Sequence, residues 1–137
     1  MDQRSRYGVT MPYEVCFTKK LEIKDLPVYI NECCWGGDVV RDRLLPSIEA
    51  GFGEVQTHQE DWGWFIWIRR ERSSMDVDIF CDDPAEGKFR MHISLRVHGF
   101  LSLRYLDDSE ELRELLTMVC AKIEAWASPC QVRQITL

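Results

Sequence analysis

Hydrophobic and polar residues alternate with a period of two over most of the chain, which is typical of strands. Apolar side chains take alternate positions over 13–23 and again, after residue 54, over 62–72, 75–82 and 88–97. Short polar breaks separate the last three runs, so we expect an antiparallel β-meander there. The segment 100–105 either extends the third run or forms another strand.

Two earlier segments carry helix signals instead. Asp25 can cap a short helical turn over 26–34, and Asp38 can cap a second helix that Gly51 closes. Pro46 is expected to kink this second helix, because proline has no N–H for the helical hydrogen bond.

The pattern is clearest near the end of the chain. Asp108 and Glu111 have the spacing of a capping box and precede an apolar stripe at helical spacing. The stripe consists of Leu112, Leu115, Leu116, Val119, Ile123 and Trp126. After Pro129, the composition of 131–137 predicts a last short strand.

This order of elements predicts an α+β fold. We expect one antiparallel meander sheet of about four to six strands, with two main helices packed on one face. No repeat or linker divides the chain, so 13–137 is interpreted as a single domain and 1–12 as a polar, mobile segment.

Matching apolar with apolar positions gives the hairpins a register. A turn through 73–74 would place Trp67 opposite Phe80 and Arg69 opposite Asp78. In that arrangement Trp67 stacks on Phe80, and Arg69 pairs with Asp78.

A loop over 83–87 would place Asp82 opposite Lys88 and Asp78 opposite His92, and Arg90 would lie over Phe80. Both registers agree on two faces. The apolar face is formed by Trp64, Ile66, Ile68, Met75, Val77, Ile79, Phe89, Met91, Ile93, Leu95 and Val97. The mixed face is formed by Phe65, Trp67, Arg69, Asp76, Asp78, Phe80, Asp82, Arg90, His92, Ser94 and Arg96.

Composition and charge argue against several classes of function. The 137 residues are 45% hydrophobic and 29% charged, which is typical of a folded domain, and the net charge of −6 argues against nucleic acid or an anionic membrane as the partner. The longest unbroken apolar run, 64–68, is far too short for the roughly 20 residues of a membrane span. Without a signal-peptide pattern near residue 1, we expect a cytoplasmic protein.

The six cysteines show no metal-ligand spacing, and we interpret them as reduced thiols. The neighbouring Cys33 and Cys34 precede a helix start, where a thiol pKa can be lowered. Asp76, Asp78 and His92 could gather around a metal ion, but nearby arginines would repel a cation, so we expect neither a metal nor another cofactor.

The mixed face is the main functional hypothesis. Aromatic and arginine side chains are the types that protein interfaces concentrate, which makes this face a candidate binding surface. The binding candidates are Phe65, Trp67, Phe80, Arg69 and Arg90. The partner would be another protein or a second copy of the chain, as in an inhibitor, an immunity-type protein or a complex subunit. The alternative without any partner is a ladder of side chains that only stabilises the sheet.

An enzyme or small-molecule binder is the rival class. A carboxylate that orients an imidazole is the arrangement of a general base, and the register brings Asp78 to His92. Ser94 is the only nucleophile candidate beside this pair. The candidate catalytic residues are therefore His92, Asp78 and Ser94.

Overall fold

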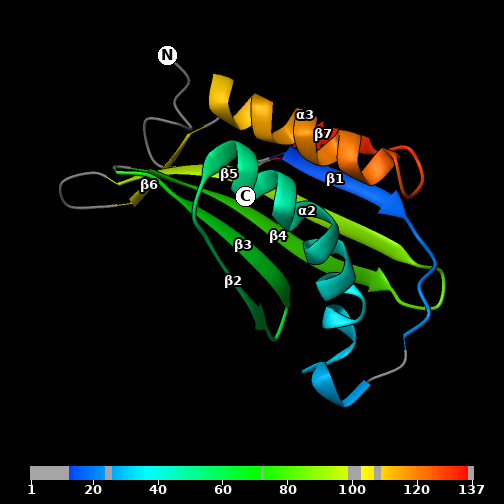
Figure 1. Ribbon diagram of the computed structural model, residues 1–137. Helices are drawn as coiled ribbons and strands as arrows, with labels where there is room; N and C mark the ends of the chain where they lie inside the picture. The colour runs from blue at the N-terminus through cyan, green and yellow to red at the C-terminus, as the bar shows by residue number, and fades with distance from the viewer. Residues whose placement is uncertain (1–12, 24–25, 72, 99–102, 107–108, 136–137) are drawn as a thin grey trace.

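The chain forms one twisted antiparallel sheet with two helices on one side, as the sequence predicts (Figure 1). The computed structural model describes residues 13–23, 26–71, 73–98, 103–106 and 109–135. The expected mobile segment 1–12 lies outside the described residues, as do the predicted caps Asp25 and Asp108.

The sheet has the strand order β2-β3-β4-β5-β1-β7. Residues 88–93 of β5 pair with β1, and residues 95–98 of β5 pair with β6. Its strands are β1 (Tyr13–Thr18), β2 (Val55–Glu60), β3 (Gly63–Arg69), β4 (Ser73–Asp83), β5 (Lys88–His98), β6 (Leu103–Leu106) and β7 (Gln131–Gln134). The meander β2–β5 is continuous in sequence. The first strand, β1, pairs with β5, and the last strand, β7, pairs with β1.

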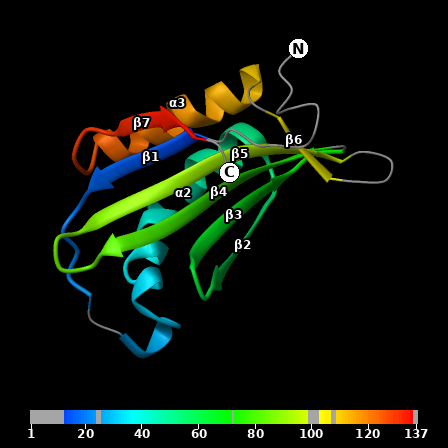
Figure 2. The same cartoon turned by 180° about the vertical axis from the view of Figure 1, so that it is seen from behind.

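Two 3-10 turns and two α-helices complete the described fold. They are η1 (Leu26–Val28), η2 (Glu32–Cys34), α2 (Gly37–Phe52) and α3 (Glu110–Glu124). Neither of these α-helices is long and apolar enough to cross a bilayer, and no other helix in the described ranges is. Both helices cover the same side of the sheet, and Figure 2 shows the opposite side without a helix over any described strand.

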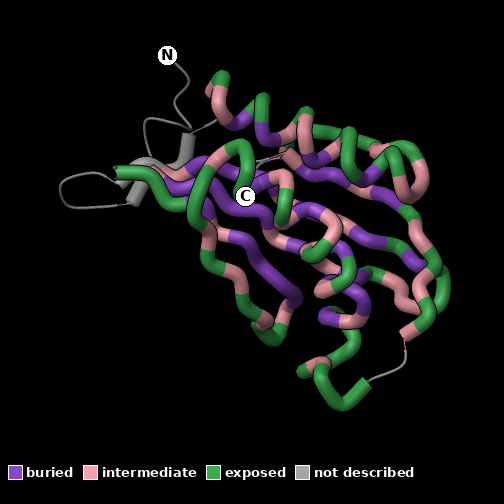
Figure 3. Tube along the Cα trace, viewed as in Figure 1, coloured by how far each residue is buried: buried purple, intermediate pink, exposed green. Residues whose placement is uncertain are grey.

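The core lies between the helices and the apolar sheet face. Four positions of α3 at helical spacing, Leu112, Leu115, Val119 and Ile123, are fully buried there. The apolar face expected from the sequence is confirmed for the described side chains of β3, β4 and β5, which are buried against the helices. Figure 3 shows in purple how the buried residues run along these strands.

Several expected boundaries are wrong in detail. Asp38 does not cap α2: the cap residue is Gly36, and the hydroxyl of Tyr29 donates to Oδ1 of Asp38 at 2.7 Å. The helix ends at Phe52 before Gly53, one residue beyond the predicted stop, and the expected helical turn over 26–34 is divided into η1 and η2. Ser109 caps α3, since its Oγ accepts from the amide of Leu112 at 3.0 Å.

The register of the β3–β4 hairpin is also wrong. The amide of Arg70 donates to the carbonyl of Ser73 at 2.8 Å, so the turn comes earlier than predicted and Ser73–Ser74 belong to β4. Trp67 therefore lies opposite Asp76, four residues from the expected partner. Because a shift of four is even, every side chain stays on its predicted face.

The other strands differ less from their predicted pairs and ends. The second hairpin has the predicted pairs Asp78–His92 and Ile79–Met91, but a bulge after Cys81 makes Asp83, not Asp82, the partner of Lys88. The first strand ends at Thr18 and the last at Gln134. The open question about 100–105 is answered for its described part, since β6 is a separate strand paired with β5.

Candidate functional site

The mixed face predicted from the sequence is the face of the sheet without helices, and we call it the open face. Alternate residues of six strands supply it, and all six contribute to one row that crosses the sheet. In strand order the row is His58, Phe65, Asp78, His92, Glu14 and Arg133.

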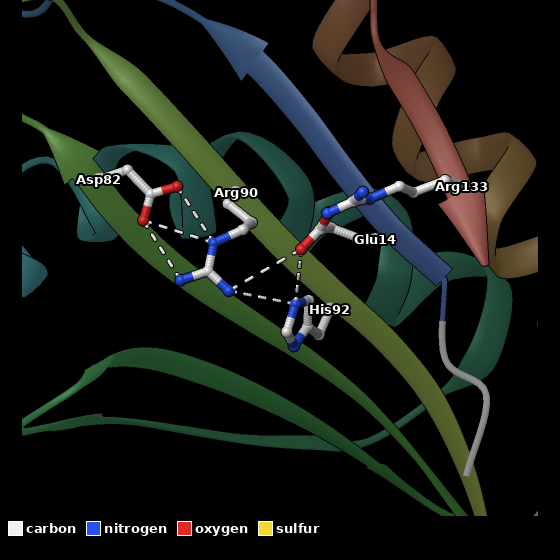
Figure 4. A network of polar contacts seen from close by, with 5 residues as sticks. All are labelled: Glu14, Asp82, Arg90, His92 and Arg133. Atoms are coloured by element: carbon white, nitrogen blue, oxygen red, sulfur yellow. Dashed lines mark hydrogen bonds and ion pairs between the residues drawn. The ribbon is translucent and has the colours of Figure 1, made fainter. Parts of the chain in front are cut away.

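A chain of polar contacts links the β5, β1 and β7 end of this row (Figure 4). Nε2 of His92 lies 3.2 Å from Oε1 of Glu14, and Nε of Arg133 donates to the other oxygen, Oε2, at 2.6 Å. The guanidinium of Arg90 lies 3.2 Å from the same His92 nitrogen and pairs with Asp82 through Nε at 3.1 Å. One carboxylate thus fixes both the imidazole and the strand β7.

The buried Glu14 carboxylate stays ionised in this setting. Its side chain is only 7% exposed, yet Oε2 accepts a charge-assisted hydrogen bond from Arg133 and Oε1 lies within hydrogen-bond distance of Nε2 of His92. Burial raises the pKa of Glu14, but the hydrogen bonds from Arg133 and His92 outweigh it and hold the pKa below its usual value.

The imidazole of His92 has two competing neighbours on Nε2. Burial chiefly lowers its pKa, and the nearby Arg90 cation lowers it further, against the raising effect of Glu14. A single ring nitrogen either donates to Glu14 or accepts from Arg90, so the tautomer decides which contact is a hydrogen bond.

Two arginine–aromatic pairs stand on the open face. The guanidinium of Arg90 lies 4.4 Å from the ring centre of Phe80, which confirms the predicted contact. That of Arg96 lies 5.1 Å from the ring centre of Trp67, and its NH2 donates to Oδ1 of Asp76 at 2.9 Å. Each guanidinium is therefore held over a ring by a carboxylate.

The aromatic contacts differ from the predicted stack of Trp67 on Phe80. With the true register, Trp67 contacts Phe65 at 4.8 Å between ring centres. Phe80 instead contacts Trp62 at 5.2 Å and the ring of His92 at 5.1 Å. The two aromatic groups share no ring contact among the described residues, and Asp76 and Asp78 on β4 lie opposite Trp67 and Phe65.

Phe65 is not an exposed binding residue, because only 7% of its surface is accessible. It supports Trp67 and contacts the ring of His58 on the edge strand β2. Of the other predicted binding residues, Trp67, Phe80 and Arg90 are half-buried and Arg69 is exposed.

The Asp78 carboxylate lacks the arginine partner, Arg69, that the sequence predicts. Arg69 lies opposite Ser74, and no described residue forms a hydrogen bond or ion pair with the half-buried Asp78 carboxylate. Burial, followed by the neighbouring Asp76 charge, raises the pKa of Asp78 to about 7 although Arg96 opposes the rise. This carboxyl group exchanges its proton near neutral pH.

The predicted catalytic constellation is only partly assembled. Asp78 and His92 are opposite each other as expected, but the carboxylate that contacts the imidazole is Glu14. Ser94 is 6% exposed and lies opposite Asp76, so it is not accessible as a nucleophile. The described residues contain no cluster of three or more metal-binding side chains.

The thiol hypothesis is also corrected. Cys34 is buried, and its Sγ donates to the carbonyl of Glu60 at 3.0 Å. Burial raises the pKa of this thiol, the opposite of activation at a helix start.

Glu14 and Arg133 are the site residues that sequence reasoning missed. Glu14 occupies the polar phase of the first predicted strand, opposite in phase to the buried Val15. That phase was visible in the sequence, but its neighbours depend on β1 lying between β5 and β7.

No family model, curated protein or solved structure matches this chain. A functional proposal for this chain therefore rests on the geometry of the site alone.

Proposed function

We propose that the protein is a non-catalytic binding domain that recognises a protein partner through the open face. The observation that carries this proposal is the presence of two clamped arginine–aromatic pairs, Arg90–Phe80 and Arg96–Trp67, on the side of the sheet that the helices leave free. Because carboxylates already fix both guanidinium groups, a partner would meet side chains that lose little conformational freedom on binding.

The distribution of exposure fits this interpretation. Half-buried Trp67, Phe80 and Arg90 occupy the middle strands, while exposed polar residues such as His58 and Gln131 occupy the edge strands β2 and β7. Protein interfaces share this anatomy, with aromatic and arginine anchors inside a polar rim.

A hollow at one end of the open face adds a place for a partner side chain. It has a volume of about 260 Å³, and Trp67, Arg69 and Arg96 contribute to its lining. Arg69 has no hydrogen-bond or ion-pair partner among the described residues, so its charge is available to a carboxylate of the partner.

The proposal is tested by site-specific cross-linking followed by a measurement of affinity. A photo-reactive amino acid replaces the exposed Gln131 at the rim of the open face, and in a matched control it replaces Thr117 on the outer surface of α3. We expect position 131 to cross-link one protein that position 117 does not reach.

That protein is then purified and titrated with the wild type and with Trp67→Ala and Phe80→Ala variants. Each variant should weaken Kd about tenfold or more, as expected for an anchor residue. An unchanged Kd for both variants would refute the open face as the binding surface. If the cross-linked protein is a second copy, sedimentation of the same variants should show loss of a dimer.

A small-molecule site is the second candidate, and Asp78 is the observation that favours it. A carboxyl group with a pKa of about 7, opposite His92 and without a hydrogen-bond partner among the described residues, can transfer protons at neutral pH. Titrating a library of small ligands while following the His92 imidazole by NMR tests it. A ligand that shifts the His92 signals in the wild type but not in Asp78→Asn would support this site, and no responding ligand would count against it.

A further inference from the structure

Exposed large apolar side chains gather in one short segment of the chain. Leu26, Val28 and Ile30 are 44%, 49% and 57% exposed, and Val39 at the start of α2 is 38% exposed. Among the described residues only one other large apolar side chain, Val132, is comparably exposed. We call Leu26, Val28 and Ile30 the apolar tip. It protrudes at the lower end of the molecule in Figure 1 and is exposed in Figure 3.

The backbone of the apolar tip is fixed by hydrogen bonds. The side-chain amide of Gln59 on β2 accepts from the amide of Ile30 at 2.8 Å and donates to the carbonyl of Val28 at 2.9 Å. Between these two contacts, the hydroxyl of Tyr29 donates to Asp38 on α2 at 2.7 Å. Tyr29 therefore packs towards the core, and the residues on either side of it keep their side chains outward.

Carboxylates surround the tip on the neighbouring segments. Asn31 donates to the carbonyl of Asp61, which brings the β2–β3 turn beside the tip. Glu32, Glu60 and Asp61 are exposed there. The segments 26–40 and 59–68 contain no lysine or arginine. Arg41, just beyond the first of them, lies over the Trp64 ring and is paired with Asp42. Within these two segments the charged side chains beside the tip are therefore acidic.

We propose that the apolar tip is a docking surface for a protein segment with an apolar stripe flanked by lysine and arginine, such as a basic amphipathic helix. The apolar stripe would cover the tip, and the basic flanks would meet the carboxylates. A second copy of this chain would bring like charges together. An anionic lipid surface would be repelled for the same reason.

This docking surface is separate from the open face. Gln59, which fixes the tip, lies opposite Trp64 and so belongs to the helix-covered phase of β2. Substitutions at the tip should therefore leave the arginine–aromatic pairs of the open face intact.

A designed peptide of about 18 residues tests the proposal, with leucines on one helical face and lysines elsewhere. Fluorescence anisotropy should detect its binding to the full chain. The Leu26→Ser, Val28→Ser, Ile30→Ser triple variant should bind it at least about tenfold more weakly, because the tip supplies the apolar contact. Equal binding by the triple variant would overturn the proposal, since the net negative charge alone would then attract the peptide.

Three controls sharpen this result. Val132→Ser removes an exposed apolar side chain elsewhere and should leave the affinity unchanged, as should the Trp67→Ala, Phe80→Ala variant of the open face. A peptide with glutamate in place of every lysine should not bind. A glutamate peptide that binds equally well would refute the role of the carboxylates, and a tenfold loss in the open-face variant would place the peptide on the wrong surface.

A further variant addresses the acidic surround directly. Glu60→Gln with Asp61→Asn should weaken the lysine peptide severalfold at low salt, and this difference should shrink at about 0.3 M salt. An unchanged affinity would contradict the proposal. If the triple variant does not fold, the single Ile30→Ser variant, at the most exposed position of the tip, replaces it, with an expected loss of about threefold.

Discussion

Oε1 of Glu14 lies 3.2 Å from Nε2 of His92, although the two residues are 78 positions apart in the chain. They face each other because β1 lies between β5 and β7 in the sheet and pairs with both. The same carboxylate also holds Arg133, so Glu14 connects the three strands at this end of the sheet.

Replacing Glu14 with glutamine should lower the pKa of His92 still further. The carboxylate raises the pKa of that imidazole against the larger effect of burial, and glutamine carries no charge. The free energy of unfolding should fall by about 1–3 kcal/mol, because Arg133 and His92 lose a charged partner. NMR titration of the imidazole and urea unfolding measure the two effects, with the exposed Glu49→Gln as a control. An unchanged His92 pKa would contradict the contact.

Glu14 also makes the free energy of unfolding depend on pH in the acidic range. Its pKa in the folded state is lower than in the unfolded chain, so it contributes stability above about pH 4.5 and loses this contribution as the pH falls through the folded-state value. The urea midpoint of the wild type should therefore fall in acid more steeply than that of Glu14→Gln. Parallel midpoint curves for the two proteins would argue against this linkage.

Asp78→Asn should stabilise the protein at alkaline pH. The folded state raises the pKa of Asp78 from 3.8 to about 7, chiefly by burial, so ionisation of this carboxyl costs folding free energy as the pH rises from 4 to 7. At pH 8 the variant should gain about 1–3 kcal/mol, with no gain at pH 4. Thermal unfolding at both pH values checks this, beside the exposed Glu54→Gln control. An equal gain at pH 4 would show that ionisation is not the cause.

Gly63→Ala should lower the free energy of unfolding, and Gly51→Ala should raise it. A Cβ at Gly63, where φ is 152°, would lie 2.1 Å from the carbonyl oxygen of Ile79, so alanine should cost roughly 2–4 kcal/mol. A Cβ at Gly51 meets nothing within 4 Å, and alanine in this helical position should add about 0.5–1 kcal/mol. Denaturant unfolding of both variants compares them, and a neutral Gly63→Ala would refute the close approach of β3 to β4.

Ser109→Ala should remove the N-cap of α3. The Leu112 amide would lose its side-chain acceptor, and the loss should be about 1 kcal/mol of unfolding free energy. Thr117→Ala on the exposed side of the same helix serves as the control, because it leaves the cap in place and slightly favours the helix. The cap assignment fails if both variants unfold at the same denaturant concentration as the wild type.

The sequence predicts which segments are strands and which are helices, because burial of one side of each element places apolar residues at a regular spacing. The stripe of α3 and the apolar positions of β3, β4 and β5 each fit only one element type, so they predict which side faces the core. The exception is β2, because its residues 56–60 are polar and show no apolar alternation. As an edge strand with alternate exposed residues, it has a weak apolar signal.

The sequence predicts less well which side chains are neighbours on the open face. Face assignments survive any even shift in register, which is why Trp67 was placed on the correct face but opposite the wrong residue. Hydrophobic matching does not distinguish registers that differ by four, whereas the position of the Arg70–Ser73 turn does.

The sequence by itself determined the α+β class, the apolar face and the residues of the mixed face, because local periodicity records which side of each element is buried. Only the tertiary structure decided that Glu14 meets His92 and that Asp78 has no hydrogen-bond partner among the described residues. It also decided that Gln59 fixes the apolar tip. These relations join strands and turns that are distant in the chain, and they depend on strand order and register, which a local pattern of period two does not encode.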